Sequence, residues 1–393
     1  MSSRIDLILG ADSINAPLTG IGRYALELAR GLPEHPAIDQ VRYFVLQGWV
    51  PLQNLLAAES GGGVHAAASR PSLRTRLAGN RAAVRVYHAL IPHLQRWQLR
   101  AEQGAIYHSP NYFLPPFPGR TVATIHDLSH HLHPQFHPAA RIDYMRRALP
   151  GCLRRADHLI TDAESVRQEL VEHYSYPAVR ITAIPLGASP AFRPHTPEEA
   201  SAHIAQWDLQ PNGYSLYVGT IEPRKNLDRL LTAYESLPQV LRQRFPLVLA
   251  GGSGWRSEHT HQRMARAASA GWLRYLRYVS QADLPALYAG ARVFVYPSLY
   301  EGFGLPVLEA MASGVPVVTS NCSSLPEVIG STGLQIHPED EAALAQAIVR
   351  VLQDDPWRMQ ASEAGLRRSA QFSWQRCVEQ TVQVYRRLQQ KTG

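Results

Sequence analysis

Two glutamates separated by seven residues, Glu301 and Glu309, stand at the point of the sequence with the clearest chemistry. Between them, Gly302 and Gly304 let the backbone approach a ligand closely, and Pro306 suits the first turn of a helix. Amides at the start of a helix have no intrahelical acceptor, so they form a site for an anion. Carboxylates beside such a site repel phosphate, and we expect them to accept hydrogen bonds from ribose or sugar hydroxyls. The segment therefore predicts a nucleotide-sugar pocket.

A second candidate site is the segment GTIEPRKNLDRLL at residues 219–231, which follows one predicted strand and precedes a helix. Arg224 and Lys225 lie side by side in this loop, and Asn226 is a plausible N-cap for the helix. Two fixed cations at the end of a strand can neutralise a leaving diphosphate, Arg as a fork of donors and Lys as a point charge. The plainer alternative is a basic pair on a surface loop. The neighbouring anion site favours the diphosphate.

A glycine pattern occurs near the N-terminus, in residues 19–31. Gly20, Gly22 and Ala25 match the dinucleotide-binding spacing G-x-G-x-x-A. That motif requires its glycines directly after the first strand, whereas Gly20 lies ten positions after Gly10, where the predicted strand ends. We instead expect these glycines to let the backbone approach a phosphate or an acceptor. A loop that caps a helix is the equally weighted alternative.

Five histidines fall within residues 124–138, which raises the question of a metal site. They lack the helical spacing with an intervening glutamate that a zinc helix shows, and no cysteine is near, so we expect no metal. His126 stands at the end of an apolar strand and is followed by Asp127, where a ligand would lie in a parallel sheet. The other four are interpreted as loop residues: His130, His131, His133 and His137.

The elements that must position these groups alternate between strand and helix along the chain. Alternation of this kind predicts an α/β fold of two doubly wound parallel sheets, with ligands at the carboxyl ends of the strands. We expect strands at 5–10, 41–47, 105–110, 121–127, 157–164 and 180–187, then at 214–220, 245–252, 273–280, 291–298, 315–320 and 333–338, and helices at 21–32, 226–237, 283–291, 305–313 and 340–355.

A chain of 393 residues is too long for one ordinary core, so two domains are expected. We place an N-terminal acceptor-binding domain at 1–188 and a proline-rich linker at 189–210. A C-terminal nucleotide-sugar domain follows at 211–371. Residues 372–393 form a last helix that crosses back toward the N-terminal domain.

Composition bounds the setting in which the protein works. Apolar residues make up 45% and charged residues 18% of the chain, as in ordinary globular proteins. Three widely separated cysteines argue against a disulfide framework and a zinc cluster, and so favour the cytoplasm. The first apolar run is too short for a signal-peptide core, and no stretch is long enough to span a membrane.

The net charge of +7 is concentrated in residues 70–100, which contain seven arginines and no acidic residue. Apolar and aromatic residues recur there at spacings near three and four, which is typical of a helix that docks on anionic lipid. Each arginine at such a surface contributes ~1 kcal/mol. A solvated basic helix and a nucleic-acid patch are the alternatives. We expect no nucleic-acid partner, because no recognised nucleic-acid module surrounds the segment.

Taken together, these motifs resemble the retaining glycosyltransferases of family 4, which have the two-domain GT-B fold. The resemblance extends over nearly the whole chain, and its most specific element is the Glu-x7-Glu pair of Glu301 and Glu309. The loop at 219–226, the helix start at 20–24 and the strand end at 125–127 agree with it. Within the family, the chain is similar to bacterial mannosyl- and rhamnosyltransferases of O-antigen and capsule assembly.

The resemblance implies roles for the candidate catalytic residues. Glu301 would contact the hydroxyls of the donor sugar, and Arg224 and Lys225 would hold the diphosphate. His126 would lie at the reaction centre near the sugar. Many relatives carry an arginine where this chain has Thr220. One phosphate-binding arginine is therefore expected to be absent, with Arg224 in its place.

The resemblance also implies how the rest of the donor would be bound. Glu309 would bind the ribose, Val279 would contact the base through its backbone, and Gly20 would lie beside the phosphate. The remaining contacts to the sugar and distal phosphate would come from the amides of Phe303, Gly304 and Leu305.

Members of this type work without a metal or cofactor, because Arg and Lys take the part that magnesium plays elsewhere. Catalysis would then consist of stabilising the departing nucleoside diphosphate and positioning the acceptor hydroxyl. The leaving phosphate would accept the proton of the acceptor on the same face, which gives retention. A GDP-linked donor is favoured over UDP- or dTDP-sugars. The expected acceptor is a lipid-linked oligosaccharide or a polysaccharide, reached at the inner face of the cytoplasmic membrane.

Two other classes of protein are compatible with the same fold. A nucleotide-sugar epimerase would need acids and bases in the cleft for proton abstraction and no lipid-facing segment. A non-catalytic scaffold that binds glycan or lipid would be expected to lose Lys225 or one of the glutamates, yet all of them are present.

Overall fold

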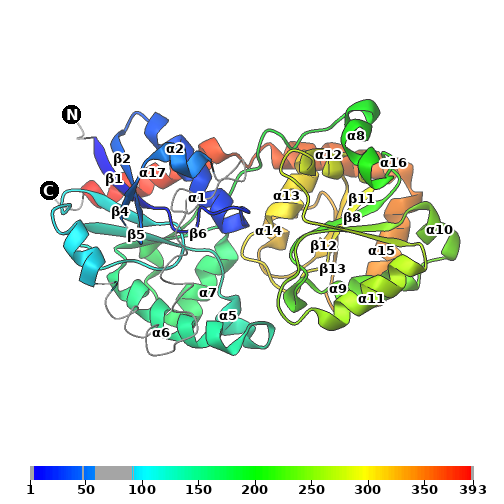
Figure 1. Cartoon of the computed structure of the whole chain (residues 1–393), viewed down its shortest axis with the longest axis horizontal. Helices are drawn as coiled ribbons and strands as arrows, with labels where there is room; N and C mark the ends of the chain where they lie inside the picture. The colour runs from blue at the N-terminus through cyan, green and yellow to red at the C-terminus, as the bar shows by residue number, and fades with distance from the viewer. Residues whose placement is uncertain (1–3, 47, 58–90, 92, 391–393) are drawn as a thin grey trace, which may run out of the picture.

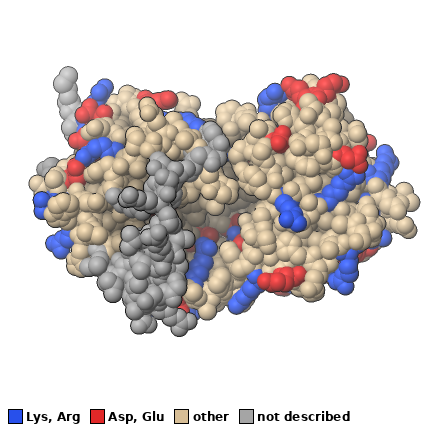
Figure 2. All heavy atoms as spheres, in the orientation of Figure 1, with Lys and Arg blue, Asp and Glu red and all other residues tan. Residues whose placement is uncertain are grey.

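The computed structural model describes residues 4–46, 48–57, 91 and 93–390 of the chain, arranged as two lobes side by side (Figure 1). Each lobe is built around a sheet of mainly parallel strands with helices on both faces. This confirms the expected α/β fold of two Rossmann-like sheets. On the face drawn in Figure 2 the molecule is hollowed where the lobes meet, and charged side chains lie at that hollow.

The N-terminal lobe contains a seven-stranded sheet in the order β3-β2-β1-β4-β5-β6-β7. All neighbours pair in parallel except β3, which forms an antiparallel hairpin with β2 at the edge and was not expected from the sequence. The strands are β1 (Ile5–Gly10), β2 (Ile38–Val45), β3 (Gly48–Val50), β4 (Ile106–Ser109), β5 (Arg120–Ile125), β6 (His158–Thr161) and β7 (Ile181–Ala183).

The C-terminal lobe contains a six-stranded sheet in the order β10-β9-β8-β11-β12-β13, and all of its pairings are parallel. Its four central strands, β8, β9, β11 and β12, are almost entirely buried, which explains why they read as continuous apolar runs in the sequence. They are β8 (Ser215–Val218), β9 (Leu247–Ala250), β10 (Leu273–Arg277), β11 (Val293–Tyr296), β12 (Val317–Ser320) and β13 (Leu334–Ile336).

Helices connect the strands and cover both sheets. Those of the N-terminal lobe are α1 (Gly20–Gly31), α2 (Leu52–Leu56), α5 (Ser129–Leu132), α6 (Ala139–Arg155) and α7 (Glu164–Tyr174). Those that follow are α8 (Pro197–Ile204), α9 (Leu227–Glu235), α10 (Gln239–Arg244), α11 (Glu258–Ser269), α12 (Leu284–Ala289), α13 (Leu305–Ala312), α14 (Leu325–Ile329), α15 (Glu341–Gln353), α16 (Asp355–Ser369) and α17 (Trp374–Gln390). Among the described residues, none of these helices combines the length and apolar character needed to cross a membrane.

Helix α1 is fixed by its cap and by one glycine. The Thr19 side chain accepts a hydrogen bond from the Gly22 amide at 3.2 Å, which satisfies one donor of the first turn. A Cβ on Gly22 would lie 2.8 Å from the carbonyl oxygen of Ser13, so only glycine fits there. A Cβ on Gly20 would meet nothing within 4 Å. The glycine pattern therefore serves partly to pack the helix start against the preceding loop.

The C-terminal helix α17 returns to the N-terminal lobe and packs against α1, β1 and β6 (Figure 1). Its Tyr385 is fully buried, with the hydroxyl 2.6 Å from Nδ1 of His108 on β4. Nε2 of His108 lies 2.9 Å from Oγ1 of Thr124, which also pairs with the Tyr24 hydroxyl at 2.9 Å. This buried network ties α17 to β4, β5 and α1.

The buried imidazole of His108 makes the fold sensitive to acid. Burial, and secondarily the charge of His126, lowers the pKa of His108 from 6.5 to about 3. Below pH 6.5 the unfolded chain binds a proton at this residue that the folded chain does not bind until about pH 3. The folded state therefore loses ~1.4 kcal/mol per pH unit from this group as the pH falls, or ~2 kcal/mol between pH 6.5 and pH 5.

The His108→Gln variant isolates this effect, because an amide can still hydrogen-bond the same two hydroxyls but does not titrate. The free energy of unfolding, measured by denaturant at pH 6.5 and pH 5, should fall ~2 kcal/mol more in the unmodified protein than in the variant. An equal fall in both proteins would contradict the buried neutral imidazole.

The basic segment predicted at 70–100 lies largely outside the described residues, and only 91 and 93–100 can be placed. In that part, the side chains of Leu94 and Trp97 are 59% and 62% exposed. The Arg100 guanidinium lies over the Trp97 ring, 5.1 Å from its centroid. This end of the segment thus presents apolar and basic side chains together on the surface.

Candidate active site

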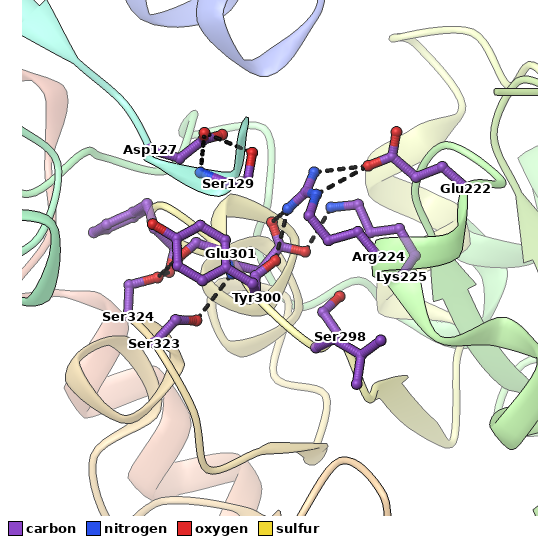
Figure 3. A network of polar contacts seen from close by, with 12 residues as sticks. Asp127, Ser129, Glu222, Arg224, Lys225, Ser298, Tyr300, Glu301, Ser323 and Ser324 are labelled. Carbon is purple, nitrogen blue, oxygen red and sulfur yellow. Dashed lines mark hydrogen bonds and ion pairs between the residues drawn. The ribbon is translucent and has the colours of Figure 1, made fainter. Parts of the chain in front are cut away.

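The two predicted motifs of the C-terminal lobe meet at one edge of its sheet. Arg224 and Lys225 lie in a short 3-10 helix, Pro223–Lys225, that follows β8, and Glu301 lies in the loop that follows β11. Strands β8 and β11 are neighbours in the sheet and run in parallel. Their carboxyl ends therefore bring together residues 76 and 77 positions apart in the sequence (Figure 3).

Glu301 bridges both cations through its two carboxylate oxygens. Nζ of Lys225 donates to Oε1 of Glu301 at 2.6 Å, and Nη1 of Arg224 donates to Oε2 at 2.9 Å. Lys225 also donates to the Tyr296 hydroxyl at 2.6 Å. The other edge of the Arg224 guanidinium donates from Nε and Nη2 to Oε1 of Glu222, at 3.1 and 2.8 Å. Two cations and two carboxylates thus form one buried cluster (Figure 3).

The charges of this cluster sustain one another. Burial raises the pKa of Glu301, but Arg224 and Lys225 lower it by more, to about 2. Burial lowers the pKa of Arg224, whereas Glu301 and Glu222 raise it well above its usual range. Burial and the neighbouring Arg224 lower the pKa of Lys225. Glu301 is therefore a carboxylate at neutral pH, and its negative charge keeps Arg224 charged in a buried site.

The loop that carries Glu301 is fixed by two serines that follow β12. The Glu301 amide donates to Oγ of Ser323 at 2.9 Å, and Oγ of Ser324 lies 2.9 Å from the Glu301 carbonyl and 2.7 Å from that of Phe303. Hydrogen bonds at both ends of the residue hold the loop in one shape. The side chain of Glu301 is consequently aimed at the basic pair rather than at solvent (Figure 3).

Helix α13 begins directly after this loop, as the sequence predicted. Gly304 has φ +110°, and a Cβ there would lie 2.7 Å from Leu325, so the position requires glycine. Within the described part of the chain, the amides of Phe303, Gly304 and Leu305 donate to no protein acceptor. The helix start therefore keeps its donors available, beside the Glu301 cluster.

Glu309 lies on α13 and is half-buried. Burial raises its pKa to about 7, against smaller lowering effects of the Tyr288 hydroxyl and of Arg23 on helix α1. Glu309 forms no ion pair with any described residue. Unlike Glu301, it is a carboxyl group of the site that titrates near neutrality.

His126 follows β5, as predicted, but its ring is held inside the N-terminal lobe. Nδ1 lies 2.7 Å from Oδ2 of Asp162, and Nε2 lies 2.8 Å from the Pro110 carbonyl oxygen. A carbonyl can only accept, so Nε2 carries a proton, and the carboxylate favours a second proton on Nδ1. Burial lowers the pKa of His126, but the charge and hydrogen bond of Asp162 oppose this effect, and the net shift of the pKa is upward. Asp162 thus fixes the imidazole and favours its charged form.

The backbone of His126, rather than its ring, meets the other lobe. A Cβ on Gly302 would lie 1.9 Å from the His126 carbonyl oxygen and 3.0 Å from Cβ of Asp127. Oδ1 of Asp127 accepts hydrogen bonds from the amide and hydroxyl of Ser129 (Figure 3). Burial raises the pKa of the Asp127 carboxyl, but Arg224 across the lobe boundary lowers it, and the net shift is downward. The two lobes are therefore in close contact at the proposed reaction centre.

Further contacts between the lobes were not foreseen in the sequence. The Tyr300 hydroxyl donates to Oε2 of Glu169 on α7 at 2.6 Å and accepts from the Leu128 amide at 3.1 Å. On α14, the Glu327 carboxylate accepts from the amides of Glu164 and Ser165, at 2.8 and 2.7 Å, and so caps helix α7 of the other lobe. Nothing in the sequence marks Glu327. Tyr300 could have been suspected only from its place beside Glu301.

The histidine-rich segment is also part of the lobe boundary. Its interpretation as loop was wrong for His130 and His131, which lie in α5, and right for His133 and His137, which lie outside helices and strands. The segment forms α5 and a 3-10 helix, Pro134–Phe136. The His133 ring packs on Tyr300 with centroids 5.1 Å apart, and the Trp255 indole of the C-terminal lobe donates to the Phe136 carbonyl. No group of three metal-ligating side chains occurs among the residues with a described position. The histidines serve as packing surface because they are held against aromatic rings.

The remaining predicted positions fall as follows. Gly20 and Thr220 are exposed, at the start of α1 and after β8, and Val279 is buried after β10. Asn226 does not cap α9 as expected: its φ is +62°, and its side chain donates to the carbonyls of Pro297 and Pro338, at 2.9 and 2.7 Å. This asparagine instead joins the loops that follow β8, β11 and β13.

A cavity of about 220 Å³ lies where the two lobes meet the start of α17. Asp162 and Phe303 line it from the two lobes, and Phe372, Arg376 and Gln380 line it from the C-terminal segment. The contact between the lobes therefore leaves a cavity beside Asp162, the partner of His126.

Two Rossmann-like sheets, with a buried carboxylate that bridges two cations beside available helix-start amides, are the arrangement expected of a GT-B glycosyltransferase. The family model described as Glycosyltransferase Family 4 matches residues 18–192, and the one described as Glycosyl transferases group 1 matches residues 202–368. The chain belongs to glycosyltransferase family 4 and is a glycosyltransferase of the GT-B fold.

Its relatives include the O-antigen chain mannosyltransferase B of Escherichia coli, 41% identical over 97% of this chain and 100% of the relative. The serotype-specific mannosyltransferase WbdA of Escherichia coli is 32% identical over 70% of this chain and 34% of that longer protein. Solved structures of the same fold include HepE of Anabaena in complex with UDP and glucose (TM-score 0.72, 17% identity, 97% of this chain and 99% of that chain). WaaG, a glycosyltransferase of lipopolysaccharide biosynthesis, has a TM-score of 0.68 at 17% identity, over 96% and 98% of the two chains.

Proposed function

We propose that the protein is a retaining, metal-independent mannosyltransferase of O-antigen assembly. It transfers the sugar from a GDP-linked donor to a lipid-linked or polysaccharide glycan. The observation that carries the proposal is the bridge from Glu301 to Arg224 and Lys225 beside the open start of α13. The choice of mannose over rhamnose is supported by the mannosyltransferase relative at 41% identity.

In this proposal the donor lies against the C-terminal lobe. The diphosphate lies at Arg224 and Lys225, and the amides of Phe303 to Leu305 donate to the distal phosphate and the sugar. Glu301 accepts hydrogen bonds from the sugar hydroxyls while it keeps the basic pair in place. Because every donor nitrogen of Arg224 is bonded to Glu222, Glu301 or the Tyr300 carbonyl, the diphosphate exchanges with some of these acceptors on binding. The rest of the donor is held by Glu309 at the ribose, Val279 at the base, and Gly20 and Thr220 near the phosphates.

Catalysis then follows from charge. As the bond between the sugar and the diphosphate breaks, negative charge grows on the leaving oxygen, and Arg224 and Lys225 stabilise that charge in a buried site. The acceptor hydroxyl attacks from the same face and gives its proton to the leaving phosphate, so the anomeric configuration is retained. Asp162 holds the imidazole of His126 behind the reaction centre and favours its protonated form, whose positive charge stabilises the developing anion.

The acceptor is brought to the N-terminal lobe. We propose that the basic segment at 70–100 places this lobe on the inner face of the cytoplasmic membrane, where a lipid-linked acceptor is anchored. The exposed Leu94 and Trp97, close to Arg96 and Arg100, support this proposal at the described end of the segment.

Thermal unfolding in the presence of GDP, UDP, dTDP and ADP tests the donor pocket. At one hundred times its dissociation constant, the true nucleotide stabilises the folded protein by ~2.7 kcal/mol. We expect the largest shift with GDP, and hydrolysis of GDP-mannose without a change of sugar stereochemistry distinguishes a transferase from an epimerase. Four equally small shifts would contradict the proposed pocket.

A further inference from the structure

Arg23 of helix α1 reaches from the N-terminal lobe to the C-terminal lobe. Its Nη2 donates to Oε1 of Gln281 at 2.7 Å, although the two residues are 258 positions apart in the sequence. Gln281 lies in the loop that follows β10, two residues after Val279. The Arg23 side chain is only 14% exposed. The guanidinium is therefore part of the boundary between the lobes and not a surface group.

The C-terminal residues around Arg23 are those assigned to the nucleoside part of the donor. Val279 was assigned to the base and Glu309 to the ribose, and the positive charge of Arg23 acts on the Glu309 carboxyl. In the proposed function, Arg224 and Lys225 neutralise the charge of the diphosphate beside the start of α13. In the proposed arrangement the nucleoside diphosphate extends from Val279 past Glu309 to Lys225. Arg23 reaches this part of the C-terminal lobe at Gln281 and Glu309.

The position of the guanidinium is set by its own helix. Nη1 of Arg23 lies 3.6 Å from Oε1 of Glu27, one turn further along α1. Glu27 also pairs with Arg30, at 3.3 Å. The acid thus holds one edge of Arg23 toward α1 and leaves the Nη2 edge directed at Gln281. A phosphate oxygen makes a stronger, charge-assisted hydrogen bond to such an edge than the neutral amide oxygen of Gln281 does.

Resting on the proposed function, we propose that Arg23 is a donor-binding residue supplied by the N-terminal lobe. On binding, its Nη2 edge leaves Gln281 and contacts the phosphate next to the ribose. The donor then lies between cations of both lobes, with Arg224 and Lys225 on one side and Arg23 on the other. Binding of the nucleoside diphosphate thereby favours the closed arrangement of the lobes.

Calorimetric titration with GDP, and with UDP in parallel, tests the inference in four variants and the unmodified protein. Arg23→Gln should weaken GDP binding by about tenfold or more, because a charge-assisted hydrogen bond is lost. Arg23→Lys, which keeps the charge, should recover most of that loss. The matched control Arg30→Gln removes the other arginine bonded to Glu27 and should bind GDP as the unmodified protein does. Gln281→Leu removes the present partner of Arg23 and should change affinity by less than about twofold.

The outcomes separate this inference from the proposed function. If the unmodified protein binds GDP and Arg23→Gln binds it equally well, the inference is wrong and the function stands. If Gln281→Leu or Arg30→Gln loses as much affinity as Arg23→Gln, Arg23 acts only through the packing of α1, and the inference is again wrong. If the unmodified protein binds neither GDP nor UDP, the proposed donor is wrong and the inference falls with it.

Discussion

Replacing Lys225 with alanine should lower the rate of sugar transfer by a factor of about 10²–10³ while the protein stays folded. The ammonium group is buried, bonded to Glu301 and Tyr296, and placed to stabilise the departing diphosphate. Its loss removes a fixed positive charge from a site that excludes water, where such charges act most strongly. Glu301 keeps Arg224 as a partner in this variant, so no acid is left buried without a cation.

Arg229→Ala is the matched control, because it removes a cation four residues further on that is partly exposed and does not touch Glu301. Single-turnover transfer from GDP-mannose should be nearly unchanged in the control. Glu301→Gln is the companion variant, preferred to alanine because it keeps the shape of the side chain between the two cations. Full activity in Lys225→Ala, with the protein shown to be folded, would refute the assignment of the basic pair to the leaving group.

Replacing Gly302 with alanine should reduce transfer by about 10²-fold, because the lobes can no longer meet at the reaction centre. The new methyl group would lie 1.9 Å from the carbonyl oxygen of His126 and 2.8 Å from its carbonyl carbon. Both neighbours are backbone atoms and cannot rotate away, so the lobes must separate. Nucleotide affinity should fall by no more than the loss of the Arg23 contact accounts for, about tenfold, since the proposed donor contacts on the C-terminal lobe are untouched.

Gly104→Ala is the control for this variant, because a Cβ there meets nothing within 4 Å. The measurements are kcat for transfer and the dissociation constant for GDP, both determined in the two variants and compared with the unmodified protein. A loss of GDP binding as large as the loss of transfer, and so well beyond the tenfold expected from Arg23, would show local damage to the loop instead of a failure of closure.

Most of the fold could be predicted from the sequence because its strands are short, apolar and buried. Runs such as ARVFVYPS and VPVVTS contain β11 and β12, and helix α13 begins at Leu305 as its glycines and Pro306 indicated. The edge hairpin formed by β3 was missed, since a three-residue strand with one exposed face carries no periodic pattern. The capping role of Asn226 was wrong because its left-handed backbone directs the side chain away from α9.

The candidate site was predictable only where it depends on sheet topology. Neighbouring parallel strands end together, so Glu301 and the basic pair had to converge. Contacts between the lobes follow a different rule, since they depend on how two separately folded sheets are placed. Tyr300 with Glu169, Glu327 with the start of α7, and Arg23 with Gln281 therefore have no sequence signal. The contact of His126 with Asp162 obeys the first rule, because the two residues follow the neighbouring parallel strands β5 and β6.

The central claim is that Glu301, Arg224 and Lys225 surround the diphosphate end of one nucleotide-sugar donor. A crystal structure with GDP-mannose bound to the slow Lys225→Ala variant, solved beside a GDP complex of the unmodified protein, tests it most directly. In the GDP complex, the distal phosphate should lie within hydrogen-bond distance of Lys225 and of the amides at the start of α13. In the variant, the mannose hydroxyls should lie against Glu301. Well-defined nucleotide bound elsewhere, with the Glu301 cluster unchanged and unoccupied by phosphate, would contradict the account.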